Sequence, residues 1–309
     1  MGVFYETLPP SLVPWLLDQK VFWIGSAPLA GDGHVNVSPK GVSDKGGPFF
    51  GVIKEQQQQQ QPRTPNENVE AEANADADAD ADADKIGNGN VLIRKFWYMD
   101  LTGSGIETTS HLHEPGNGRI TVMFNAFSGP PRILRIFGKG NVLEYGTREF
   151  NEIVAAQKIT IIPGTRSIIV VDIHQVGTSC GFSMPCYSFV SFRPTLNDFF
   201  EKKLANEKAG KRKDGIEVYW ASKNACSMDG LPGLKRGVKT GSIEKVQPIK
   251  KMVGRYAPLK GPRRPQRVFT VGHLILVALL SCMSTAIVIL GLLRLGIGIA
   301  SFKPKRVLV

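Results

Sequence analysis

Short apolar runs separated by glycine and proline fill the first two thirds of the chain. The clearest two, Ile120 to Phe127 and Arg132 to Gly140, flank the dipeptides Ser128-Gly129 and Pro130-Pro131. Apolar runs bounded by turn residues are typical of strands, so this stretch predicts a hairpin. The first run is almost continuously apolar, which predicts a strand that is buried on both faces.

Other runs of this kind predict further strands and a smaller number of helices. Strands are expected over 21–27, 34–38, 49–53, 96–101, 167–174 and 187–192. Helices are expected over 11–19, 107–113, 148–158, 196–213 and 218–225, with Ser11 and Thr195 as N-caps of the first and fourth. Pro39-Lys40-Gly41 is expected to end the second strand. Seven or eight strands with few helices predict a mainly β fold, a small antiparallel barrel with peripheral helices.

Residues 54–95 interrupt this pattern with six consecutive glutamines and, later, alternating alanine and aspartate. Such a composition cannot bury a core, so a disordered insert is expected. The runs on either side, 49–53 and 96–99, resemble the two arms of a hairpin whose turn has been expanded. Closing the longer loop costs only about 2 kcal/mol. We therefore expect the sheet to survive the insert, and the insert to be dispensable.

A second apolar stretch, residues 268–293, contains no Lys, Arg, Asp or Glu. Because about 20 apolar residues cross the hydrocarbon core, this stretch predicts a transmembrane helix, with a buried soluble helix as the alternative. It follows a basic linker over 236–267 and precedes a short basic tail over 294–309. The larger basic load on the N-terminal side predicts a single-pass, C-terminally anchored protein whose folded domain faces the cytosol. The pattern does not choose the organelle.

The net charge of +11 comes mainly from residues 232–309, which are rich in bases and contain one acid, Glu244. The folded part is nearly neutral, which argues against nucleic acid as a partner. The four cysteines form no C-x-x-C pair, so neither a zinc site nor a disulfide framework is expected. A reducing compartment fits this usage, and the N-terminus lacks a secretory signal pattern.

Candidate chemistry gathers in Thr102-Gly103-Ser104-Gly105, directly after the expected strand 96–101. Glycines let backbone N–H groups approach a ligand and the hydroxyls add donors, although a simple turn is the alternative. Arg132, Arg135 and Lys139 lie among apolar residues, where they suit an anionic ligand or solvent. Thr178-Ser179-Cys180-Gly181 is either a second ligand loop or a tight turn with a buried thiol. The histidines are expected to be structural, with His111 and His113 alternatively a surface pair.

Four segments together resemble the pyridoxamine 5'-phosphate oxidase-like family, the FMN-binding split barrels, in a fungal-type branch. They are IGSAPLAGDGHVNVSPKG (24–41), FWYMDLTGSGIETTSHLHEPGNGRITVMFNAFSGPPRILRIFGKG (96–140), VGTSCGFSMP (176–185) and SKNACSMDGLPG (222–233). The resemblance covers 1–53 and 96–235 and implies a split-barrel domain over 1–235. It also implies a homodimer with flavin sites between the subunits. By position, the phosphate contacts carried over from the family are Ser38, Lys40, Thr102, Gly103, Ser104 and Arg132.

The resemblance implies an FMN-dependent oxidoreductase whose small-molecule substrate is unknown. The loop has glycine where the oxidases usually show a Ser-Arg-Lys run, so deazaflavin and haem are alternatives to FMN as cofactor. A non-enzymatic flavin- or haem-binding module or scaffold is the alternative function. No catalytic residue or metal site is assigned, since a flavin supplies the hydride chemistry itself.

Overall fold

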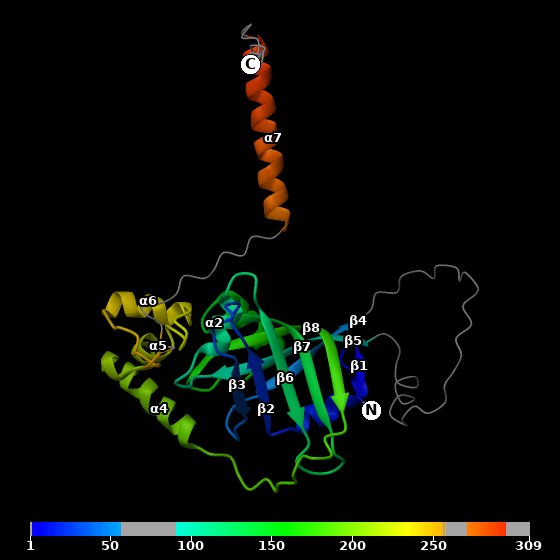
Figure 1. The fold of residues 1–309 in the computed structure, drawn as a ribbon. Helices are drawn as coiled ribbons and strands as arrows, with labels where there is room; N and C mark the ends of the chain where they lie inside the picture. The colour runs from blue at the N-terminus through cyan, green and yellow to red at the C-terminus, as the bar shows by residue number, and fades with distance from the viewer. Residues whose placement is uncertain (1, 57–90, 256, 258–270, 295–309) are drawn as a thin grey trace, which may run out of the picture. The chain divides into compact units, whose positions relative to one another are not determined.

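The computed structural model describes residues 2–56, 91–255, 257 and 271–294. The chain divides into two compact units, Met1–Gln266 and Arg267–Val309. The first unit is an antiparallel sheet with helices at its periphery, as Figure 1 shows. The described strands are β1 (Val3–Tyr5), β2 (Val21–Ser26), β3 (Asn36–Gly41), β4 (Phe50–Gln56), β5 (Val91–Leu101), β6 (Arg119–Asn125), β7 (Ile133–Glu144) and β8 (Thr165–Ser179).

The strands lie in the order β3-β2-β6-β7-β8-β5-β4, and β1 also pairs with β8. Side chains from strands that are distant in this order contact each other, which shows that the sheet curves strongly. The rings of Phe22 on β2 and Phe50 on β4 lie 5.1 Å apart, and Phe22 also stacks on Phe124 at 5.2 Å. These rings fill the centre of the main core. The expected mainly β fold with peripheral helices is therefore confirmed.

The predicted hairpin around Gly129 is present, with β6 and β7 paired from Arg119↔Lys139 to Asn125↔Ile133. Gly129 has a φ of +71°, a left-handed conformation that glycine adopts without strain. The prediction that the first strand is buried on both faces was wrong. Along β6, Ile120, Val122 and Phe124 are buried while the residues between them are half-buried, because only one face of the strand meets the core.

The two arms expected around the insert do form a hairpin, and both are longer than predicted. β4 runs to Gln56 and β5 begins at Val91, and these two residues pair with each other. Residues 54–56 and 91–95 therefore belong to the sheet rather than to the insert. The remaining 57–90 lie outside the described residues.

The helical elements are η1 (Pro10–Leu12), α1 (Val13–Asp18), α2 (Glu107–His113), α3 (Arg148–Ala156), α4 (Thr195–Lys208), η3 (Arg212–Asp214), α5 (Ile216–Lys223), α6 (Lys235–Glu244) and α7 (Val271–Arg294). Neither Ser11 nor Thr195 provides a side-chain cap, since α1 begins after Leu12 and α4 after Pro194. Pro39 does not end β3, because this edge strand tolerates a residue without an N–H group and continues to Gly41.

Two further segments differ from expectation. Residues 187–192 form no strand; Tyr187, Phe189 and Val190 are exposed, and no strand of the described chain pairs with them. The expected linker over 236–267 begins with α6, which packs closely on α5. A Cβ at Gly237 would lie 2.8 Å from the Trp220 carbonyl oxygen, so the glycine allows this approach.

The second unit contains α7, and Val271–Leu292 within it has a mean hydropathy of 2.6. By length and composition, this is the one described helix that is suited to cross a membrane. Helix α7 covers the predicted span of 268–293 from residue 271 onward and ends one residue later, at Arg294. Residues 268–270 lie outside the described residues.

Candidate functional site

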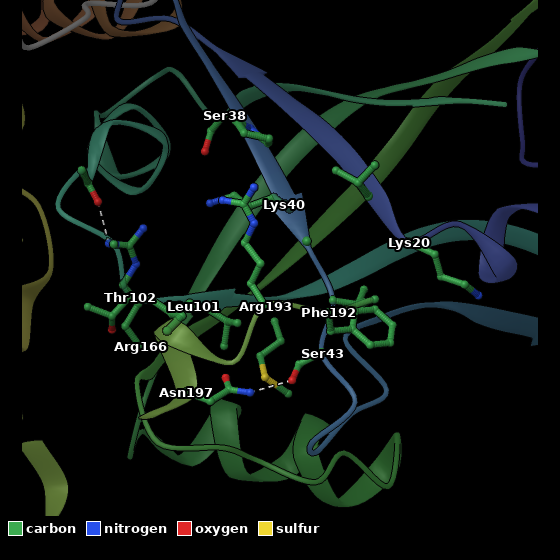
Figure 2. A pocket seen from close by; sticks show the side chains of 18 of the residues that line it. Lys20, Ser38, Lys40, Ser43, Leu101, Thr102, Arg166, Phe192, Arg193 and Asn197 are labelled. Atoms are coloured by element: carbon green, nitrogen blue, oxygen red, sulfur yellow. Dashed lines mark hydrogen bonds between the residues drawn. The ribbon is translucent and has the colours of Figure 1, made fainter. Parts of the chain in front are cut away.

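A hollow of about 670 Å³ opens between β3, the loop after β5 and the start of α4. Figure 2 shows that Ser38 and Lys40 of β3, Thr102 of the loop and Arg193 before α4 all belong to its lining. The hollow thus collects residues that are far apart in sequence. Five of the six predicted contacts line it, namely Ser38, Lys40, Thr102, Gly103 and Ser104.

The β3 wall follows from the twofold period of a strand. Asn36, Ser38 and Lys40 share one face and are half-buried, while Val37 and Pro39 point the other way and are exposed. Asn36 was not predicted, and it donates a hydrogen bond from its side-chain amide to the Thr108 hydroxyl at 3.2 Å. The strand therefore presents an amide, a hydroxyl and an amine in line along the hollow.

Beneath this wall lies a buried charge cluster. Lys40 Nζ contacts one carboxylate oxygen of Asp100 at 2.8 Å, and Arg166 Nε contacts the other at 2.7 Å. Burial by itself raises the pKa of Asp100, but the charges and hydrogen bonds of Arg166 and Lys40 outweigh it and lower that pKa to about 2. Arg166 also donates to the Gly105 carbonyl at 2.6 Å, which ties the cluster to the loop. The cluster carries two positive charges and one negative charge.

The loop itself is divided between structural and accessible groups. Thr102 is 1% exposed; its hydroxyl donates to the Gly164 carbonyl and accepts from Trp220 Nε1 at 2.9 Å. The Gly103 carbonyl accepts from the Asn224 amide at 3.0 Å. Ser104, in contrast, is exposed at the hollow. Thr102 thus holds the loop in place, and Ser104 is the hydroxyl that faces outward.

The opposite wall comes from the irregular segment before α4 and from the first turn of that helix. Phe189, Phe192 and Arg193 line the hollow, and the two phenyl rings lie 4.8 Å apart. Asn197 donates from its side chain to the Ser43 hydroxyl at 2.6 Å, which joins α4 to the loop after β3 (Figure 2). The hollow therefore has a basic, hydrogen-bonding wall and a partly aromatic one.

Arg132, the sixth predicted contact, does not line the hollow. It precedes β7, and its guanidinium lies over the Trp15 ring, 5.5 Å from the centroid. Sequence reasoning also missed Arg166 and Arg193. A base that opens the apolar run of β8 was a usable signal for Arg166, whereas nothing local marks Arg193.

The remaining candidates lie away from the hollow. Cys180 is exposed, so the proposal of a buried thiol was wrong. His111 and His113 are buried or nearly so, which excludes the surface pair. Burial lowers the pKa of His111, against the opposing charges of Asp229, Glu114 and Glu107. Among the described residues, no group of His, Cys, Asp and Glu is arranged to hold a metal ion.

The fold is a curved antiparallel barrel with a basic hollow beside its edge strand β3. Sequence comparison shows the family. The chain is 31% identical over 251 residues to the pyridoxamine 5'-phosphate oxidase family protein ustO from Aspergillus flavus. The match covers 77% of this chain and 80% of that protein. The chain belongs to the pyridoxamine 5'-phosphate oxidase family. No family model matches it.

The solved structures that match this chain are remote from it. HupZ from Group A Streptococcus is 11% identical with a TM-score of 0.31, and the match covers 55% of this chain and 92% of that one. An FAD-binding protein from Mesorhizobium loti is 10% identical with a TM-score of 0.28, covering 58% and 96%. A putative pyridoxamine 5'-phosphate oxidase from Listeria innocua is 11% identical with a TM-score of 0.26, covering 54% and 93%. Family membership rests on the Aspergillus relative.

Proposed function

We propose that this chain is an FMN-dependent oxidoreductase that binds the flavin phosphate in the hollow beside β3. The observation that carries the proposal is the convergence of Ser38, Lys40 and Ser104 on one hollow beside Arg166. A phosphate dianion prefers several donors and at least one cation, and charge-assisted hydrogen bonds are the strongest of these. The family supports the same ligand class.

The donor set fits a phosphate, with roles that differ from residue to residue. Lys40 uses one N–H on Asp100, and an ammonium has three donors, so it can still bind an anion. Ser38 and Ser104 would donate hydroxyl protons. Thr102 would act by positioning the loop, because its own hydroxyl is already bonded on both sides. Arg132 is no part of this proposal.

Bound flavin supplies hydride chemistry, and the chain binds and orients it. The Asp100 cluster keeps Lys40 and Arg166 in place and leaves a net positive charge near the phosphate site. The aromatic pair Phe189 and Phe192 offers an apolar surface on the opposite wall. None of the described residues that line the hollow is a histidine or a cysteine, and we assign no proton donor or nucleophile.

Spectroscopy of the full chain in detergent tests this proposal. Purified protein should show flavin absorbance or should take up added FMN, with riboflavin binding more weakly because it lacks the phosphate. Lys40→Gln should weaken FMN binding roughly 10- to 100-fold, the value of a charge-assisted hydrogen bond. Lys95→Gln, which changes a half-buried lysine that does not line the hollow, should leave FMN binding unchanged.

Other outcomes separate the alternatives. Protein that takes up none of FMN, deazaflavin and haem contradicts the cofactor proposal. Preferential uptake of deazaflavin or haem replaces FMN with that cofactor. If neither NADPH nor any other electron donor tried reduces the bound FMN, the result supports a non-enzymatic binding module.

We propose further that the protein is a homodimer and is anchored by α7 with the barrel in the cytosol. Exposed apolar side chains on the irregular segment before α4, such as Phe182 and Val190, support a covering subunit. A light-scattering mass of one chain would contradict the dimer. Extraction by alkaline carbonate would contradict the anchor, and a barrel protected from protease in intact organelles would reverse its orientation.

A further inference from the structure

A second hollow, of about 710 Å³, lies between the end of β7 and α6 and shares no lining residue with the first. Val142, Leu143 and Ile243 give it apolar lining, and Lys235 and Lys239 add two amines. The proposed flavin site does not use this region. Mixed apolar and cationic lining at the surface is suited to an amphiphilic anion.

The formal charges of the lining balance, but they are not equally accessible. Glu144 is buried and accepts the backbone N–H groups of Lys235 at 2.8 Å and Arg236 at 3.1 Å. The Glu217 carboxylate accepts hydrogen bonds from Arg236 Nε at 2.6 Å and from the Thr240 hydroxyl at 3.1 Å. These contacts satisfy two of the three lining acids from within the fold. The third, Glu149, is exposed and is the one lining acid without an internal donor in the described structure.

The lysines, in contrast, remain available. Lys235 and Lys239 are exposed, and neither forms an ion pair with any residue of the described chain. Two more exposed lysines, Lys245 and Lys250, follow α6. Glu244 lies next to Lys245 but pairs with Arg212 at 2.9 Å, so it offsets another cation. The exposed lysines on and after α6 therefore give this part of the surface a positive accessible charge.

Apolar side chains are interleaved with these lysines. Val238 is 43% exposed and Ile243 65%. We call the exposed lysines and aliphatic residues of this helix the α6 face; it consists of Lys235, Val238, Lys239 and Ile243. Alternating exposed lysines and aliphatic residues are typical of surfaces that lie on anionic bilayers, where bases meet headgroups and aliphatic side chains enter the boundary.

We propose that the α6 face binds the anionic phospholipid headgroups of the membrane into which α7 inserts. The proposal goes beyond the flavin function and rests on the proposed anchoring. Chain length permits it, since the residues between Val253 and Val271 can span up to about 60 Å when extended. Phosphate groups would meet Lys235 and Lys239 at the second hollow, and Ile243 would contact the acyl boundary.

The test uses the full chain in lipid nanodiscs and follows amide hydrogen exchange of α6. Discs of phosphatidylcholine alone are compared with discs that also contain phosphatidylserine. We expect slower exchange over Lys235–Glu244 in the anionic discs, and loss of that difference at high salt. In Lys235→Gln/Lys239→Gln the protection should fall about fivefold for each base removed. The matched control, Lys208→Gln/Lys211→Gln, removes two exposed lysines near the end of α4 and should behave as wild type.

Each other outcome overturns the proposal in a distinguishable way. Equal exchange in both kinds of disc means that the α6 face does not bind anionic lipid. Protection produced in neutral discs by soluble glycerol phosphate assigns the hollow to a free phosphate ester. Failure of the chain to enter discs removes the anchor on which the proposal rests. FMN binding, measured on the same samples, reports separately on the proposed function.

Discussion

Two contacts between a carboxylate and a guanidinium have nearly the same length and very different surroundings. Asp100 and Arg166 meet at 2.7 Å, with their side chains 0% and 5% exposed. Glu217 and Arg236 meet at 2.6 Å, with 20% and 42% exposed. The first pair lies under the proposed phosphate site and the second beside the α6 face. Burial, rather than length, decides what each pair contributes, because water screens the second and not the first.

The largest expected effect comes from Asp100→Asn. This change leaves Arg166 and Lys40 without their shared counter-ion inside the fold, and loss of one partner of a buried pair costs about 3–5 kcal/mol. The free energy of unfolding, measured with urea and tryptophan fluorescence, should fall by that amount. A loss below about 1 kcal/mol would mean that water or relaxation compensates for the missing carboxylate charge, and that the buried pair contributes no more than the exposed one.

Acid should reveal the same cluster in the wild-type protein. The folded-state pKa of Asp100 is about 2, below its ordinary value of 3.8, so its stabilisation is fully present above pH 4. It is lost as the pH falls from 4 through 2, at a cost of about 2 kcal/mol. The stability of Asp100→Asn should lack this component. Identical acid profiles for the two proteins would contradict the assigned cause.

An intermediate effect is expected from Thr102→Val, which preserves shape but removes a buried hydroxyl. Trp220 Nε1 would lose its acceptor, and an unpaired buried donor costs about 1–3 kcal/mol. Ser104→Ala, two residues later and exposed, should change stability by less than about 0.5 kcal/mol. The reverse ranking would show that Ser104, not Thr102, holds the loop. FMN titration of both variants then separates positioning of the loop from direct binding.

The smallest effect is expected from Glu217→Gln. Its pair with Arg236 is partly exposed, and such pairs contribute about 0–1 kcal/mol. Thermal and urea unfolding should therefore barely change. The cation–π contacts of the Arg236 guanidinium with the Tyr145 and Trp220 rings should persist. A loss comparable to that of Asp100→Asn would show that α6 docking depends on this pair.

Local sequence signals identified much of the scaffold. The β6–β7 hairpin, the paired arms around the insert and helix α2 follow from apolar runs and turn residues, which act between near neighbours. The family resemblance, and not the local pattern, assigned Ser38, Lys40 and the loop from Thr102 to Ser104 to one site, and these residues do line one hollow. Local pattern failed for residues 187–192, where an apolar run has strand character but pairs with no strand of the described sheet.

What the sequence determined by itself is the set of segments that must be buried or that suit a bilayer. Alternation along β3 places Ser38 and Lys40 on one face. The apolar composition of α7 by itself makes this helix suited to a bilayer. Tertiary structure alone decided that Lys40 and Arg166 meet at Asp100, since β3 and β5 are far apart in the strand order and approach only because the sheet curves. It also decided that Thr102 is bonded inward by Trp220 while Ser104 faces out. Side-chain period is a property of one strand, whereas a buried ion pair depends on the geometry of the whole sheet.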